Sequence, residues 1–285
     1  MRALLGLFLL ALATGCTAPT VETATVQVEP QRIITLNGTL TEIVAAIGLE
    51  DRIVGTDVTS KYPEAVNALP KLGHDRSIRA EGILSLSPDL VLANEGQLDP
   101  AVEGQIRQAG IRLMLFAPRN NIAGTKELII RIADSLHRTV ESRKIVDAIE
   151  EGLAAVVPLQ PAPKVLFIYA RGAGTLLVAG EGTPIQALIG LAGGTNAISG
   201  FSDFKPLTPE ALVAADPDVV LLFNTGQEHL QGNEALMRVP GMASTSAGRD
   251  QAFITLQPVV MAGFGPRVGE AVTELNKDLR AATMP

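Results

Sequence analysis

Tyr62 is the side chain of this sequence whose type and setting point most directly to metal chemistry. It lies between Lys61 and Pro63, after the strand-like segment Arg52–Thr56. Proline disfavours a helical conformation at the residue before it and suits the first position of a helix, so we expect a helix over Pro63–Leu69. The positive end of that helix and Lys61 would favour the phenolate form of Tyr62. A phenolate is a hard donor suited to ferric iron, and tyrosine is one of the axial ligands of haem iron.

Tyr62 also has a structural interpretation, in which its ring packs in a core and its hydroxyl finds a hydrogen-bond partner. The histidines, His74, His137 and His229, lie in three separate regions and lack the spacing of a His-rich metal site. His137 is expected on a helix and His229 in a polar loop, so packing and solvation explain both. His74 stays a candidate because it follows the Tyr62 segment closely.

Enzyme motifs are scarce, although one enzyme class stays open as an alternative. The sequence has no G-x-S-x-G, P-loop or H-E-x-x-H motif. Two glycine-containing turns could serve a Rossmann-like enzyme. The run that starts at Gly172 has Leu177 where a dinucleotide fingerprint needs its third glycine, which favours a simple turn. The run that starts at Gly263 reaches Pro266, which has no N–H to offer an anion.

Composition limits the classes of partner. The chain has 285 residues, 47% of them hydrophobic, and a formal net charge of −7. This is enough apolar material for one large core or two moderate ones. The acidic balance argues against a nucleic-acid partner, which would need a basic face. No apolar run reaches the roughly 18 residues that a membrane-spanning helix requires.

Residues 1–16 have the form of an export signal. A positive start is followed by the apolar stretch Ala3–Ala13, which is too short to span a bilayer. The only cysteine, Cys16, follows this stretch as in a lipobox, where the cysteine is lipidated, while Ala11–Ala13 also fits ordinary signal cleavage. We favour lipidation because one acyl anchor suits a domain held at a membrane. Residues 17–31, rich in Thr, Val, Glu and Pro, are expected to be a flexible tether.

A repeat indicates how the rest of the chain is organised. Ala80–Ala93 aligns without a gap with Pro209–Leu222, so that Glu81 coincides with Glu210. Both copies contain a short helix, a Pro-Asp turn and an unbroken apolar strand. Such strands are typical of parallel sheets that are covered on both faces. Two similar α/β lobes with a cleft between them favour a ligand-binding protein over a single-site enzyme.

Alternating strands and helices predict two Rossmann-like lobes with parallel sheets, residues 32–123 and 163–285. Between the lobes, apolar residues recur at helical spacing, so we expect one long connecting helix over residues 124–158 rather than two shorter ones. The expected strands are Arg32–Leu36, Arg52–Thr56, Leu90–Ala93 and Arg112–Phe116 in the first lobe, and Lys164–Tyr169, Val219–Phe223 and Ala252–Leu256 in the second. The other expected helices include Leu40–Ile47, Pro184–Leu191 and Pro266–Ala281.

With these features the sequence resembles the periplasmic haem-binding proteins of bacterial haem ABC importers, which belong with the siderophore- and cobalamin-binding proteins. The resemblance covers nearly the whole chain from Arg32 onward. It implies the fold of a class III periplasmic binding protein, with two Rossmann-like lobes joined by one long α-helix. The segments that carry it are Asp57–Pro63, Leu69–Gly73, Ala80–Leu86, Leu191–Ala197 and Gly263–Arg267.

The resemblance also implies roles for particular residues. Tyr62 would be the axial ligand of haem iron. Arg171, after the first strand of the second lobe, would hydrogen-bond the phenolate or a haem propionate, since arginine cannot ligate iron. Glu81 and Glu210, one on each lobe, would dock onto the ABC permease dimer, which works with its ATPase subunits. The apolar candidates for the pocket wall are Phe201, Phe204, Met261 and Phe264, for which core packing is an equally good interpretation.

Fold does not fix ligand, so a ferric-siderophore or cobalamin carrier is the nearest alternative. The alternative from another class is an exported Rossmann-like enzyme, which the export signal disfavours because nucleotide cofactors are scarce outside the cytoplasm. The resemblance implies a periplasmic protein or one anchored on the outer side of the cytoplasmic membrane.

Overall fold

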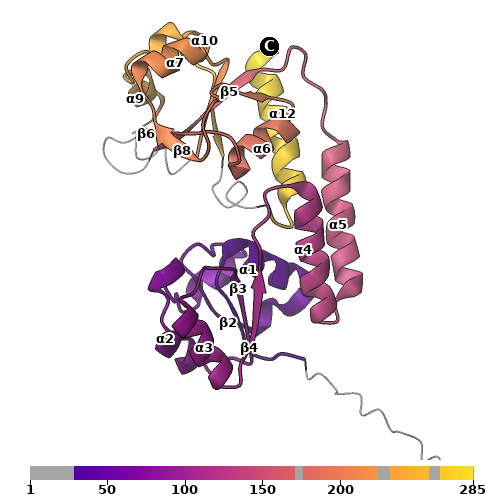
Figure 1. The fold of residues 1–285 in the computed structure, drawn as a ribbon. Coiled ribbons are helices and arrows are strands. Elements are labelled where there is room, and N and C mark those ends of the chain that lie inside the picture. Colours follow the sequence, from indigo (N-terminus) through magenta and orange to yellow (C-terminus); the bar gives the residue numbers. More distant parts are fainter. Residues whose placement is uncertain (1–28, 171–175, 224–231, 257–263, 285) are drawn as a thin grey trace, which may run out of the picture.

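The computed structural model describes residues 29–170, 176–223, 232–256 and 264–284, and it shows two α/β lobes (Figure 1). The first lobe contains a fully parallel four-stranded sheet in the order β2-β1-β3-β4. Its strands follow the apolar runs of the sequence: β1 (Ile33–Thr35), β2 (Ile53–Thr56), β3 (Leu90–Asn94) and β4 (Arg112–Phe116).

Two helices of the first lobe, α1 and α3, begin at recognisable caps. Asn37 accepts from the backbone N–H of Thr39 at the start of α1, and Asp99 accepts from that of Ala101 at the start of α3. Gly48 supplies a positive φ of 82° in the wide turn that follows α1. The helices and helical turns are α1 (Gly38–Val44), the π-helical turn Ala45–Leu49, α2 (Ala80–Ser85), α3 (Pro100–Gln108) and the 3-10 turns Glu50–Arg52, Glu64–Ala68 and Asp75–Ser77.

The helix expected over Pro63–Leu69 is a five-residue 3-10 turn instead. An α-helix would need an N–H at residue 70 to bind the carbonyl oxygen of Val66, but Pro70 has none; that oxygen accepts instead from the N–H of Leu69 at 3.2 Å and from the Nζ of Lys71 at 2.9 Å. Leu69 precedes a proline, which disfavours a helical conformation there. Pro63 has an extended conformation and does not lie inside a helix.

The prediction of a single connecting helix over residues 124–158 is wrong. Two helices, α4 (Ile122–Ser135) and α5 (Thr139–Ala154), lie side by side in Figure 1. His137 adopts a left-handed conformation, with φ of 57°. The N–H groups of His137 and Arg138 bind the carbonyls of Asp134 and Ala133, respectively, which closes α4 with a Schellman motif. A motif of this kind usually has glycine at the left-handed position, so no residue type marks the break in advance.

The second lobe has a mixed sheet in the order β10-β9-β5-β6-β8, with β7 beside β5. The expectation of a parallel sheet holds for β10, β9, β5 and β7, whereas β6 pairs antiparallel with both β5 and β8. Only five residues separate β5 from β6, which is too few for a parallel crossover. The strands are β5 (Lys164–Ala170), β6 (Leu176–Ala179), β7 (Thr195–Asn196), β8 (Phe204–Pro206), β9 (Val219–Phe223) and β10 (Phe253–Leu256).

A close helix crossing joins the second lobe to α5. Gly152 of α5 faces Gly269 of the last helix, and a Cβ added at Gly152 would lie 2.6 Å from the carbonyl carbon of Gly269. One apolar cluster accordingly includes buried side chains of both lobes, among them Leu92 and Leu221. The helices of the second lobe are α6 (Pro184–Leu191), α7 (Pro209–Ala215), α9 (Asn233–Met237), the 3-10 turn Met242–Ser244, α10 (Ser246–Asp250) and α12 (Val268–Thr283).

Glu29, inside the stretch expected to be a tether, makes ordered contacts. Its carboxylate pairs with Arg52, at 2.9 Å, and with Arg138. Arg52 also donates to the carbonyl oxygen of Pro30 at 2.8 Å. Arg52 directly precedes β2, so the chain enters the first lobe at the edge where the strands begin. Among the described residues, no helix is both long and apolar enough to cross a membrane.

Candidate functional site

The loop after β2 carries Tyr62, and a buried carboxylate shapes its first turn. Asp57 is 1% exposed and accepts four hydrogen bonds of 2.5 to 3.1 Å, from the backbone N–H and the hydroxyl of both Thr59 and Ser60. Every acceptor direction of this carboxylate is therefore occupied or nearly so. Ligands of open α/β sheets bind at the carboxyl ends of the strands, and this loop lies at that edge.

Lys71 holds the same loop from the other side. Its Nζ donates to the hydroxyl of Thr56 and to the carbonyl oxygens of Ser60 and Val66, at 2.8 to 2.9 Å. Burial, with a smaller contribution from Lys61, lowers the pKa of Lys71. The ammonium group thus uses its three donors to connect the end of β2 with both sides of the Tyr62 loop.

Tyr62 stands at the boundary between the lobes. Its side chain is 43% exposed, and within the described part of the chain its hydroxyl has no hydrogen-bond partner. The guanidinium carbon of Arg267 lies 3.7 Å from the centroid of its ring, which is a cation–π contact. Arg267 directly precedes α12, so a residue of the second lobe covers one face of a side chain of the first.

Arg267 is also paired with Glu42 of α1. Its Nε and Nη2 donate to the two carboxylate oxygens at 3.0 and 2.9 Å, and the side chains are 21% and 12% exposed. Burial raises the pKa of Glu42, although Arg267 acts in the opposite direction. Burial alone would lower the pKa of Arg267, but the hydrogen bonds and charge of Glu42, together with the nearby Tyr62 and Glu270, raise it overall. The contact is a partly buried, bidentate bridge between the lobes.

His74 offers a second donor in the first lobe. It lies at the start of the 3-10 turn Asp75–Ser77, and its Nδ1 is 2.9 Å from a carboxylate oxygen of Asp75. A histidine held through one ring nitrogen presents the other to a ligand. The turn borders a pocket of about 480 Å³ whose lining includes Asp75, Arg76, Asn94 and Pro118. Asn94 ends β3 and Pro118 follows β4, so the pocket lies at the carboxyl edge of the sheet.

The aromatic side chains expected in the pocket wall separate into two groups. Phe264, 4% exposed, lines a pocket of about 140 Å³ together with Asn37 and other residues of the first lobe. Phe201 packs in the core of the second lobe and Phe204 is 42% exposed on β8. The ring of Phe204 lies 6.1 Å from that of Tyr169. Of these three, Phe264 is the one that shares a described pocket with residues of the first lobe.

Three of the residues singled out in the sequence, Arg171, Met261 and Cys16, lie outside the described residues. Glu81 and Glu210 are exposed, each at the second position of a short helix in its own lobe, α2 or α7. The structure therefore presents the two carboxylates at equivalent places of the repeat. It brings neither of them to the Tyr62 loop.

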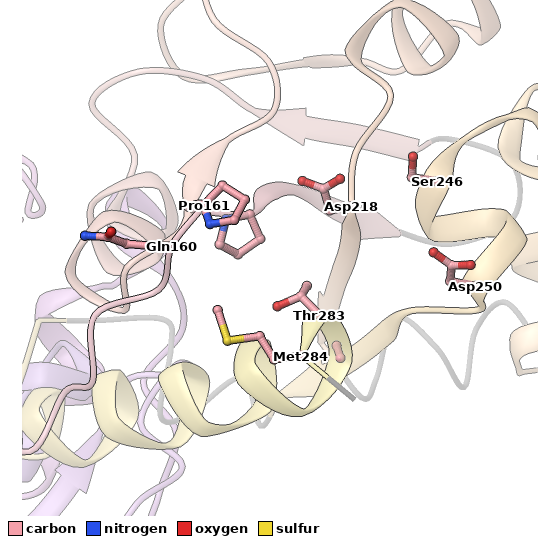
Figure 2. Close-up of a pocket in the computed structure, with 9 residues that line it drawn as sticks. Gln160, Pro161, Asp218, Ser246, Asp250, Thr283 and Met284 are labelled. Atoms are coloured by element: carbon pink, nitrogen blue, oxygen red, sulfur yellow. The ribbon is translucent and has the colours of Figure 1, made fainter.

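A larger pocket, of about 790 Å³, lies elsewhere (Figure 2). Its lining includes Pro163 and Asp218, which precede β5 and β9, and Thr283 near the end of α12. It is therefore at the edge where strands begin, opposite the edge at which ligands of open α/β sheets bind. Size alone does not make it the ligand site.

Sequence reasoning missed the roles of Glu42 and Arg267. Arg267 ends the segment Gly263–Arg267, which was noted only for its likeness to a family. No local pattern shows that this residue reaches Tyr62, because the two are separated by most of the chain. The arginine expected beside the phenol was Arg171, whereas among the described residues Arg267 is the one that contacts the ring.

Solved structures similar to this one include those of several heme-binding proteins. The periplasmic heme-binding protein RhuT from Roseiflexus sp. RS-1, in apo form, is 37% identical, with a TM-score of 0.82 over 89% of this chain and 99% of that one. The periplasmic heme-binding protein BhuT, in complex with two hemes, is 37% identical, with a TM-score of 0.82 over 88% and 98%. The heme binding protein HmuT is 31% identical, with a TM-score of 0.76 over 87% and 84%.

Curated relatives span more than one ligand. The ABC transporter substrate-binding lipoprotein YvrC of Bacillus subtilis, itself uncharacterized, is 24% identical over 90% of this chain and 82% of its own length. A cobalamin-binding protein of Halobacterium salinarum is 30% identical over 69% of this chain and 55% of its own. Residues 33–260 match the periplasmic binding protein family. The match covers most of the chain, and the two-lobed structure agrees with it. This chain therefore belongs to the periplasmic binding protein family.

Proposed function

We propose that this protein is an extracytoplasmic substrate-binding protein that captures haem between its lobes and delivers it to an ABC permease. The observation that carries the proposal is the 37% identity, over nearly nine-tenths of the chain, to two heme-binding proteins of the same fold. The exposed donors at the carboxyl edge of the first sheet support it. As a carrier it would perform no chemical step, and haem would be its cargo.

We propose Tyr62 as the iron ligand from the first lobe. Its phenol has no hydrogen-bond partner among the described residues, and Arg267 lies over one face of its ring, so the oxygen is available to a ligand. His74 is the second candidate in this lobe. A metal-bound histidine commonly gives its other ring nitrogen to a carboxylate, and Asp75 holds His74 in this way.

Solved variants of HmuT favour including His74 and Tyr169 in the test. They replace a tyrosine, an arginine two positions later and a histidine roughly a hundred positions before the tyrosine. In this chain Tyr169 and Arg171 have the same tyrosine-to-arginine spacing, and His74 precedes them by a similar distance. Tyr169 is the penultimate residue of β5, at the carboxyl edge of the second sheet. The second arrangement is therefore His74 and Tyr169, with Arg171 as a hydrogen-bond donor.

Titration of the purified protein with hemin tests both the function and the ligand. We expect a saturable Soret band in the wild type. Tyr62→Phe should remove the phenolate-to-iron charge-transfer band if Tyr62 ligates, whereas His74→Ala and Tyr169→Phe should change the spectrum if the second arrangement holds. Saturable binding of cobalamin or a ferric siderophore, with hemin failing to compete, would overturn the haem assignment.

The partners and location follow from the same proposal. We propose that Glu81 and Glu210 dock onto the two subunits of the permease, and that Cys16 carries a lipid that keeps the protein at the outer side of the cytoplasmic membrane. The lipoprotein name of YvrC supports the second point. Cys16→Ser should release the protein from membranes; an unchanged membrane fraction, or none in the wild type, would favour ordinary signal cleavage.

A further inference from the structure

The residues just before α12 belong by sequence to the second lobe but contact the first. The carbonyl oxygen of Phe264 accepts a hydrogen bond of 3.4 Å from the hydroxyl of Thr125, and the Phe264 side chain is buried. A Cβ on Gly265 would lie 3.6 Å from Thr39 and 3.8 Å from Glu42. Arg267 completes this contact by reaching Glu42 and Tyr62. The segment Phe264–Arg267 is thus seated on the surface of the first lobe.

The helix behind this segment leaves it little freedom to shift. Two residues after Arg267, Gly269 packs against Ile149 and Gly152 of α5, and a Cβ on Gly269 would lie 2.8 Å from the carbonyl oxygen of Ile149. The hydroxyl of Thr273 binds the carbonyl oxygen of Gly152 at 2.7 Å. Because backbones in such close contact cannot slide without clashes, the start of α12 is a fixed support for Arg267.

The geometry points to Arg267 as a cross-lobe positioning residue: held by Glu42, it fixes the ring of Tyr62 at the lobe boundary and ties the two lobes together there. The planar guanidinium makes both contacts possible, because two of its edge donors bind the carboxylate while its carbon lies close over the ring. A lysine cannot reproduce this arrangement, since its ammonium group is a point charge without a planar face.

The aromatic content of the chain allows Tyr62 to be observed alone. The protein has two tyrosines and no tryptophan. In a Tyr169→Phe background, tyrosine signals therefore come from Tyr62. The near-ultraviolet circular dichroism of this residue reports whether its ring is held in one orientation, and it needs no bound haem.

In that background, Arg267→Gln should remove more than half of the Tyr62 dichroism while the far-ultraviolet spectrum stays that of a folded protein. Glu42→Gln should reduce the band as well. Combining the two substitutions should add little, because each alone already removes the pairing of Arg267 with Glu42. Arg267→Lys should not restore it. Arg131→Gln is the matched control, because Arg131 lies 5.6 Å from the ring of Phe116, where no tyrosine is involved.

An unchanged Tyr62 band in folded Arg267→Gln would overturn the inference, and Glu42→Gln provides the same test if the arginine variant does not fold. The expected effect on hemin affinity rests on the proposed function. Arg267→Gln should weaken hemin binding roughly tenfold, as does the loss of residues that orient the ligands of other metal sites. The two failures are distinguishable, since absence of hemin binding in the wild type refutes the function whereas the dichroism of the apo-protein tests only the positioning role.

Discussion

Asp89 and Asp218 make the same contact in the two lobes. A carboxylate oxygen of Asp89 accepts from the backbone N–H of Gln31 at 2.7 Å, and one of Asp218 accepts from that of Lys164 at 2.7 Å. Asp89 directly precedes β3, and Asp218 directly precedes β9. Each binds the backbone at the start of the neighbouring strand, β1 or β5, which is the first strand of its lobe. The repeat seen in the sequence is therefore a repeat of atomic contacts.

The same repeat predicts how Glu81 and Glu210 should behave. Both carboxylates are exposed in the first turn of a short helix, where their interaction with the helix dipole is worth a few tenths to about 1 kcal/mol each. We expect Glu81→Ala combined with Glu210→Ala to leave hemin affinity and the melting temperature nearly unchanged and to impair uptake through the permease. Glu234→Ala, another exposed first-turn glutamate, is the control. Normal uptake by the double variant would exclude docking.

Asp57→Ala should destabilise the protein and weaken ligand binding together. The substitution leaves the N–H groups and hydroxyls of Thr59 and Ser60 without their buried acceptor, at a cost of about 2–4 kcal/mol. Asp57→Asn keeps one acceptor oxygen and should lose less. Urea unfolding and hemin titration measure the two effects. A variant with wild-type stability would show that Asp57 does not shape the loop.

Glu42 should give stability an unusual dependence on pH. Its pKa is raised by burial above the usual 4.5, so the folded state binds the proton more tightly than the unfolded state. The resulting contribution to the free energy of unfolding is full below pH 4.5 and is lost as pH rises through the folded pKa. The stability of Glu42→Gln relative to wild type should therefore rise over this range, as urea unfolding at a series of pH values would measure. A fall would mean that pairing with Arg267 outweighs burial.

The helix crossing predicts opposite effects at two helical glycines. Gly152→Ala would place a methyl group 2.6 Å from the carbonyl carbon of Gly269, so we expect a loss of about 1–3 kcal/mol. At Gly190, within α6, no atom beyond its chain neighbours and the backbone of its own helix lies within 4 Å of an added Cβ. Gly190→Ala should therefore stabilise the protein by about 0.5–1 kcal/mol. Thermal or urea unfolding compares them, and equal effects would contradict the close crossing.

Local patterns predicted the strands well and the contacts between lobes poorly. Arg112–Phe116 and Val219–Phe223 have the expected bounds, because unbroken apolar runs between turn residues specify buried strands. The break at His137 was missed because helical periodicity continues across it and no glycine or proline marks it. The pairing of Arg267 with Glu42 was missed for another reason: it depends on how two lobes pack, which no short segment encodes.

The pairing of Glu29 with Arg52 and Arg138 would also set how the protein is held at a membrane, given the proposed acylation of Cys16. The dozen residues 17–28 can span at most about 40 Å when fully extended. Glu29 lies beside the start of β2, whereas Tyr62 follows the end of that strand. The mouth of the proposed ligand site would thus face away from the point of attachment. A carrier held in this way would search for its transporter by diffusion in a plane, within a thin layer above the lipid.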